Sequence, residues 1–243
     1  MLDWDTPLYT YLPYEDIAHD ERYKLITARM VVSHTTGFPN WRSGRLEILF
    51  TPGSQYGYSG EGFEYLGKVA AHLTGKELVE LVQDEVFTPL GMDNAFLTWN
   101  GESGGPKARP HLNGDAPLPR QRWDEPRMAA SLHVDARTYA RFLIAVSQAV
   151  GLSEATIEEM LRPQSKVPDS DASFGLGFAL EPSPFGLRFG HGGSNDGFTS
   201  GSCLYRESGL GYVVLVNNQR VGYLDKALRA FLVTGQVEAD TQG

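Results

Sequence analysis

Gly57-Tyr58-Ser59-Gly60-Glu61-Gly62 is the stretch of this 243-residue chain from which its organisation is best worked out. Directly after it comes an apolar stripe at three- and four-residue spacing, formed by Phe63, Leu66, Ala70 and Leu73. That spacing predicts a helix from about Glu61 to Leu73, and Gly75 is its C-terminal stop signal. Tyr58-Ser59-Gly60 is therefore expected on the turn that leads into the helix.

Helical patterns predominate in the chain before Ser173. Capping residues and apolar stripes predict further helices at about 28–32 after Thr27, at 76–87, from Asp135 to Val150 and at 153–161. The stretch from Asn100 to Arg127 is rich in Gly, Pro and charge, and it predicts a long surface loop that borders a cleft.

Period-two patterns replace the helical ones after Ser173. They predict strands at 174–180, 187–191, 199–205 and 212–216, followed by a last helix from Leu224 to Val233. Helices first, then an antiparallel meander, then one helix is an α+β order. We expect one domain over residues 1–243, with a helical part at about 14–165 and a C-terminal sheet and helix at about 173–235.

Tyr58 is the first candidate for chemistry. Its phenol is expected at the tip of a turn ahead of a helix N-terminus, whose amides and dipole favour the phenolate. Such a tyrosine can act as a general acid or base. The alternative is a turn tyrosine with a solvated hydroxyl and no role.

His191 is the second candidate, at the end of a predicted strand. Gly192 and Gly193 follow it and allow a substrate to approach the backbone closely, while the amide of Ser194 can serve an oxyanion. The alternative is a strand that ends in a glycine turn. His34, in Ser33-His34-Thr35-Thr36-Gly37, is interpreted as a hydrogen-bonding residue at a helix end.

Composition excludes several other classes of function. The 30 acidic and 21 basic residues give a net charge of −9, which disfavours a nucleic acid as partner. The six histidines and the single Cys203 show no metal-ligand spacing, no nucleotide or dinucleotide glycine motif is present, and we expect neither a metal nor a cofactor. No window approaches the roughly 20 apolar residues of a membrane span. Nothing here indicates the compartment.

Six further segments occur in an order that resembles one known family. They are Leu2-Asp3-Trp4-Asp5-Thr6-Pro7 with Tyr11-Leu12-Pro13, Val32-Ser33-His34-Thr35-Thr36-Gly37, Pro52-Gly53 before Tyr58-Ser59-Gly60, Phe87-Thr88-Pro89-Leu90-Gly91-Met92, Phe174-Gly175-Leu176-Gly177-Phe178 and Gly190-His191-Gly192-Gly193. The chain resembles the serine β-lactamase-like family, in its class C and D-alanyl-D-alanine carboxypeptidase branch with esterase relatives. The resemblance implies an acyl-enzyme mechanism in which Tyr58 protonates the leaving group and then activates water.

Two departures from the family pattern matter. Gly60 stands where the family's Tyr-Ser-Asn motif has asparagine, which favours esterase or peptidase activity over classical β-lactam turnover. No serine in the chain is followed three residues later by lysine, so the family's Ser-x-x-Lys nucleophile motif is missing. Ser59 and Ser194 also fail the Gly-x-Ser-x-Gly elbow, with Glu61 and Asp196 in its last place.

Three hypotheses follow. The chain is the C-terminal part of a serine hydrolase acting on an ester, D-amino-acid amide or β-lactam; or a non-catalytic member that binds a ligand or partner; or a short hydrolase with an unrecognised serine such as Ser59. Without the family's first strands the sheet is expected to keep an unpaired edge. We therefore expect a marginal monomer, self-association, or a complementing N-terminal segment, and a monomer melting above about 60 °C would contradict this.

Overall fold

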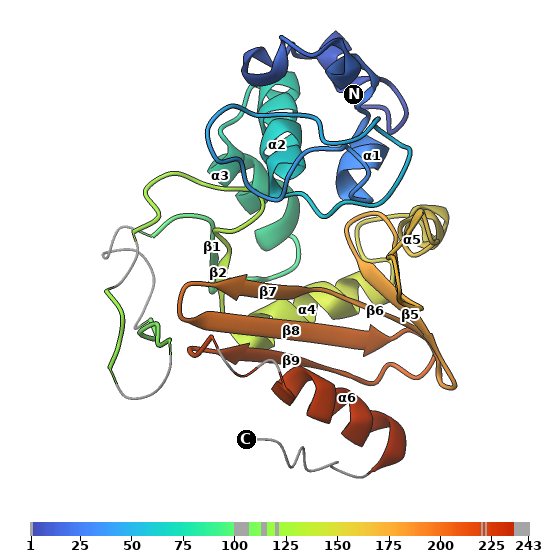
Figure 1. Ribbon diagram of the computed structural model, residues 1–243. Helices are drawn as coiled ribbons and strands as arrows, with labels where there is room; N and C mark the ends of the chain where they lie inside the picture. The colour runs from blue at the N-terminus through green and yellow to red at the C-terminus, as the bar shows by residue number, and fades with distance from the viewer. Residues whose placement is uncertain are drawn as a thin grey trace.

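The computed structural model describes residues 2–99, 107–112, 116–119, 122–219, 221 and 223–235. Figure 1 shows the helices α1 (Ala28–Val32), α2 (Gly60–Thr74) and α3 (Leu78–Val82) at one end of the molecule and the main sheet at the other. Three short 3-10 turns, Leu8–Thr10, Glu15–Ile17 and Glu21–Leu25, precede α1. The α+β class expected from the sequence is confirmed.

Local capping explains where the first helices begin and end. The Thr27 hydroxyl accepts a hydrogen bond from the Met30 amide at the start of α1, and the Ser59 hydroxyl accepts one from the Gly62 amide at the start of α2. α2 ends at Gly75, which has a left-handed φ of 66°. The helix predicted at 76–87 instead begins at Leu78 and continues beyond α3 as a π-helical turn over Gln83–Phe87.

The sheet contains β3 (Ser165–Lys166), β4 (Ser173–Phe174), β5 (Ala179–Ser183), β6 (Gly186–Gly190), β7 (Gly192–Asn195), β8 (Phe198–Tyr205) and β9 (Gly211–Val216). All neighbouring strands are antiparallel. A separate pair joins β1 (Ala95–Phe96) to β2 (His133–Val134). The strand predicted at 174–180 is interrupted, because the chain turns at Gly177, where φ is +86°.

β8 is the central strand of the sheet. One of its sides pairs with β9, and the other side pairs first with β7 and then with β6. β6 and β7 therefore act as one strand that is broken at His191. β7 is not predicted from the sequence, and among the described residues no strand pairs with the far edge of β9.

Helices cover both faces of β8 and β9. Val213 of β9 packs into a core cluster with Leu143 and Val146 of α4 (Ala136–Ser147), whereas the neighbouring Tyr212 donates a hydrogen bond to Asp225 of α6 (Tyr223–Thr234). Since successive strand residues point to opposite faces, α4 and α6 lie on opposite sides of the sheet, as Figure 1 shows. α4 and α5 (Glu154–Met160) thus pack with the sheet, although they fall within the predicted helical part.

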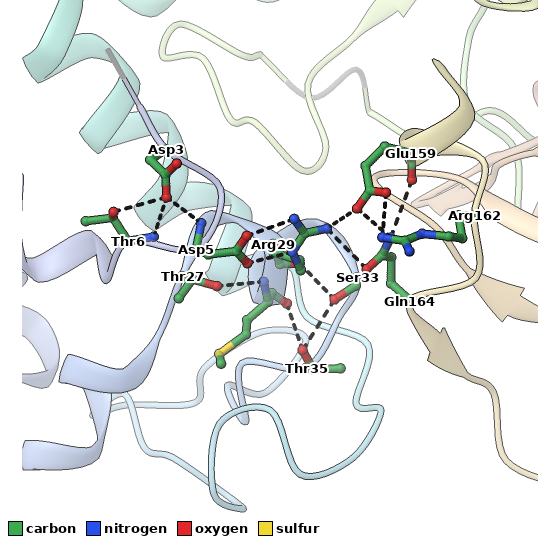
Figure 2. A network of polar contacts seen from close by, with 11 residues as sticks. Asp3, Asp5, Thr6, Thr27, Arg29, Ser33, Thr35, Glu159, Arg162 and Gln164 are labelled. Atoms are coloured by element: carbon green, nitrogen blue, oxygen red, sulfur yellow. Dashed lines mark hydrogen bonds and ion pairs between the residues drawn. The ribbon is translucent and has the colours of Figure 1, made fainter. Parts of the chain in front are cut away.

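A polar network ties the N-terminal segment to the rest of the fold (Figure 2). The Arg29 guanidinium of α1 binds Asp5 at 2.6 Å and Glu159 of α5 at 2.5 Å, and Arg162 binds the other oxygen of Glu159. These arginine contacts lower the pKa of both carboxyl groups. Segments about 130 residues apart are joined here by charge-assisted hydrogen bonds.

Candidate active site

Tyr58 lies between two histidines at the start of α2. Its ring stacks on that of His34 at a centroid distance of 4.1 Å, and its hydroxyl lies 3.4 Å from Nε2 of His191. The side chain is 41% exposed and lines a cleft. Residues 133 positions apart, both predicted as site residues, therefore meet.

Burial raises the pKa of Tyr58. This is opposite to the shift expected from the helix N-terminus, and the reason lies in the geometry. The hydroxyl reaches across to His191, while the α2 N-terminal amide of Gly62 is capped by Ser59. Tyr58 is thus a neutral phenol near pH 7 and is suited to donate a proton.

His191 occupies the break between β6 and β7. Its Nδ1 lies 2.5 Å from the carbonyl oxygen of Gly192, which can only accept, so Nδ1 carries the proton and Nε2 is free to accept from Tyr58. Burial lowers the pKa of His191, with the Gly192 contact opposing the shift. Ser202 fixes the backbone, because its amide and its hydroxyl both donate to the His191 carbonyl at 3.0 and 2.9 Å.

The predicted oxyanion segment forms the open edge of the sheet. Gly192, Gly193 and Ser194 are exposed on β7, line the cleft, and pair with β8 on one side only among the described strands. A Cβ at Gly192 would meet only the Ser200 carbonyl oxygen, at 3.4 Å. A substrate can therefore approach this backbone.

The side chain of Ser59 has a structural role. Its side chain is 1% exposed, and its hydroxyl donates to the Pro39 carbonyl at 2.9 Å while it accepts from the Gly62 amide at 3.1 Å. Both hydrogen bonds hold the N-terminus of α2. A buried capping serine engaged in this way is a poor candidate for a nucleophile.

Trp41 explains why residue 60 is glycine. A Cβ at Gly60 would lie 2.8 Å from Cη2 of the indole and 3.0 Å from the Asn40 carbonyl oxygen. The Asn40 side chain accepts a hydrogen bond from the Gly60 amide at 3.1 Å. The loop before α2 thus fills the space that an asparagine side chain at position 60 would need.

His34 is a site residue for which the sequence predicts only a helix-end role. It follows the end of α1, and its buried Nδ1 accepts a hydrogen bond from the Ser59 amide at 3.1 Å, which confirms that role. The missed signal is its backbone: φ is +56°, a left-handed conformation that glycine usually adopts. Burial lowers the pKa of His34 to about 3, with the charge of His191 as a second cause.

The cleft between these elements has a volume of about 1750 Å³. Its lining includes Asn195, Asp196 and Phe198, and it includes Tyr139, Val213 and Leu215 where the cleft extends over the sheet. The described parts of the predicted 100–127 loop also line it, and residues 100–106, 113–115 and 120–121 of that loop lie outside the described residues. The cleft is larger than the roughly 300–1000 Å³ of a typical small-molecule pocket.

Among the described residues, histidine, cysteine and carboxylate side chains form no group of three or more that could hold a metal ion. Likewise, the helices described here include none with the length and apolar character needed to cross a membrane.

Comparison with known proteins identifies the family. The family model described as Beta-lactamase matches residues 1–234. The chain belongs to the beta-lactamase family. Among curated proteins, this family member is 33% identical over 54 residues to a D-aminopeptidase of Gluconobacter oxydans, a match covering 22% of this chain and 10% of that protein. The matched part is thus a small portion of that relative's length.

Solved structures share the beta-lactamase fold at low identity. A D-stereospecific amidohydrolase from a Streptomyces species is 21% identical, with a TM-score of 0.79 over 97% of this chain and 80% of that one. A class C beta-lactamase is 15% identical, with a TM-score of 0.79 over 99% of this chain and 76% of that one. The recognition made from the sequence motifs is confirmed.

Proposed function

We propose that this chain provides the acid–base and substrate-binding part of a serine hydrolase that acts on ester, D-amino-acid amide or β-lactam bonds through an acyl-enzyme. The observation that supports this most is the meeting of Tyr58 and His191 at the cleft, 3.4 Å apart, beside the exposed glycines of β7. The names of the similar proteins, D-aminopeptidase and D-stereospecific amidohydrolase, favour D-amino-acid amides as the first substrates to test.

The chemistry assigned to Tyr58 is proton transfer. A serine hydroxyl attacks the substrate carbonyl carbon and gives its proton to the lysine of the same Ser-x-x-Lys motif, and the tetrahedral oxyanion is held by backbone amides, among them that of Ser194. The bond to the leaving nitrogen or oxygen breaks as Tyr58 donates its proton to that atom. Water then attacks the acyl-enzyme and gives a proton to the phenolate, and the bond to the serine oxygen breaks as that oxygen recovers its proton from the lysine ammonium, which releases the acid and the free serine.

We propose that the nucleophile comes from a Ser-x-x-Lys segment outside these 243 residues. The cleft supports this, since a ten-residue helix about 10 Å wide and 15 Å long occupies roughly 1200 Å³ and would fit in 1750 Å³ with room for substrate. The side of the cleft over the sheet carries apolar side chains from Tyr139, Val213 and Leu215, against which a helix can pack. A strand of the same segment would pair with the far edge of β9.

Sequencing the DNA upstream of the Met1 codon, and expressing any open reading frame that continues there in the same frame, tests the proposal. A fluorophosphonate is expected to label a serine followed three residues later by lysine, and peptide mapping locates it. Tyr58→Phe is expected to lower hydrolysis of a D-amino-acid p-nitroanilide by about 100-fold or more. Labelling at Ser59, or full activity of Tyr58→Phe, would contradict the proposal.

A non-catalytic, ligand-binding member is the second candidate, favoured by the lack of a Ser-x-x-Lys motif in the chain. Mass spectrometry separates the two. If the complete protein binds a β-lactam or boronate without a gain in covalent mass, the binding function replaces the enzymatic one.

A further inference from the structure

We propose that His34 is a positioning residue for Tyr58, one that holds the phenol ring and the Ser59 amide in place as a neutral imidazole protonated on Nε2. This inference rests on the proposed function for its catalytic meaning. Its geometric part concerns this chain alone. Three observations at His34 carry it.

The first observation is the backbone. Thr35 donates its amide hydrogen to the Met30 carbonyl at 2.8 Å, which closes the end of α1 around His34 in the left-handed conformation. Glycine, or failing that asparagine, suits this position better than histidine. A strained residue that persists next to a site is a reason to look for a function of its side chain.

The second observation is what the side chain contacts. Nδ1 accepts from the Ser59 amide, and one ring face covers Tyr58 with an interplanar angle of 27°. The ring is 1% exposed, and Phe174 meets it edge-on at 4.6 Å. Hence two consecutive residues of the turn, Tyr58 through its ring and Ser59 through its amide, are held by one imidazole.

The third observation is the unsatisfied nitrogen. Because Nδ1 is an acceptor and the ring is neutral, Nε2 carries the hydrogen, and no acceptor for it exists among the described residues. A buried donor without a partner is rare in folded proteins. Backbone strain and an unsatisfied donor both oppose folding, so a role for the contacts with Tyr58 and Ser59 explains why histidine is here.

The test uses the 243-residue chain and needs no enzymatic activity. The first readout is the ¹⁵N NMR spectrum of His34, which is expected to show Nδ1 unprotonated and Nε2 protonated from pH 5 to 8. A protonated Nδ1 in this range overturns the proposal.

The second readout is the titration of Tyr58 in His34→Asn, followed by NMR of ring-labelled tyrosine and assigned with Tyr58→Phe. Asparagine keeps the left-handed preference and an acceptor near the Ser59 amide but removes the ring that covers the phenol. The Tyr58 titration is expected to move to lower pH. An unchanged titration overturns the proposal, because a residue with only a structural role would alter stability and leave Tyr58 as it is.

Glycine substitutions supply a matched control. Asp169 has a φ of +54°, nearly that of His34, but is exposed. Asp169→Gly is expected to maintain or raise the melting temperature, whereas His34→Gly is expected to lower it and to shift the Tyr58 titration. Equal effects would show that the His34 ring contributes nothing.

Kinetic measurements on the enzyme described under the proposed function distinguish this inference from that function. A loss of kcat without a change in KM in His34→Asn supports both. If the wild-type enzyme hydrolyses nothing while the Tyr58 titration still depends on His34, the proposed function fails and the positioning role stands.

Discussion

The two walls of the cleft are built in opposite ways. The turn wall, Tyr58–Gly60, is held by hydrogen bonds that it donates to His34, Pro39 and Asn40, and its Ser59 is fully buried. The strand wall, Gly192–Asn195, is exposed along its whole length and pairs on one side only among the described strands. Under the proposed function, the difference assigns the catalytic geometry to one wall and the approach of the substrate to the other.

The largest effect is expected where the strand wall is anchored. In Gly190→Ala the new Cβ would lie 2.0 Å from the Ser202 carbonyl oxygen, a backbone atom of β8 that cannot move aside. We expect a loss of about 3 kcal/mol or more in the free energy of unfolding, measured by urea denaturation. Gly192→Ala is the matched control, with its nearest atom at 3.4 Å, and is expected to lose less than about 1 kcal/mol. Equal losses would mean that the strand wall is rigid throughout.

The second-largest effect is expected at acidic pH, where the turn wall loses stability. The pKa of His34 is about 3 in the folded protein and 6.5 in the unfolded chain, so between these values only the unfolded state binds the proton. Stability is therefore complete above about pH 6.5 and falls as the pH decreases, by about 2 kcal/mol between pH 7 and pH 5. The lowered pKa of His191 acts in the same direction.

Denaturation of His34→Asn at pH 7 and pH 5 measures this contribution. The variant is expected to lose less stability over this range than the wild type does. His72→Asn, on the exposed face of α2, controls for the replacement itself. If His34→Asn keeps the full wild-type pH dependence, the neutral state of His34 does not matter for folding.

A smaller effect is expected from the cap of α2. Ser59→Ala removes the acceptor for the Gly62 amide and the donor to the Pro39 carbonyl, both in buried surroundings. We expect a loss of about 1 to 2 kcal/mol in thermal or urea unfolding. Ser153→Ala removes the exposed cap of α5 and is expected to cost about 0.5 to 1 kcal/mol. If Ser59→Ala and Ser153→Ala cost the same stability, burial of the Ser59 cap does not increase its contribution.

The turn wall was the more predictable of the two. The apolar stripe and the glycine stop place α2 within one or two residues, because these features depend on local spacing. That Tyr58 and His191 share one site was implied only by the resemblance to a known family. The local signals also predict β8 and β9 nearly to the residue.

Features that depend on contacts between segments far apart in the sequence were not predicted. β7 is a strand only because β8 pairs with it, since Gly192-Gly193-Ser194-Asn195 has no strand propensity of its own. The position of the Trp41 indole beside Gly60 and the hydrogen bond from the Ser59 amide to His34 join segments about 20 to 25 residues apart. The direction of the Tyr58 pKa shift was wrong for the same reason, since burial by other segments outweighs the helix N-terminus.

The smallest effect on stability is expected where the two walls meet. His191→Phe removes the acceptor for the Tyr58 hydroxyl, a long and partly exposed hydrogen bond of 3.4 Å. We expect a change of about 0.5 kcal/mol or less in the free energy of unfolding, because water replaces the lost partner.

Under the proposed function, the same variant is expected to lower turnover of a D-amino-acid amide by about tenfold or more, because Tyr58 loses the group that orients its proton. Ser202→Ala, which removes one hydrogen bond to the His191 carbonyl, controls for a shift of the strand alone. If the Tyr58–His191 hydrogen bond contributes little to stability but much to turnover, the proton transfer takes place where the turn wall meets the strand wall. Turnover unaffected by His191→Phe would instead assign the proton transfer to Tyr58 alone and leave the strand wall with substrate binding.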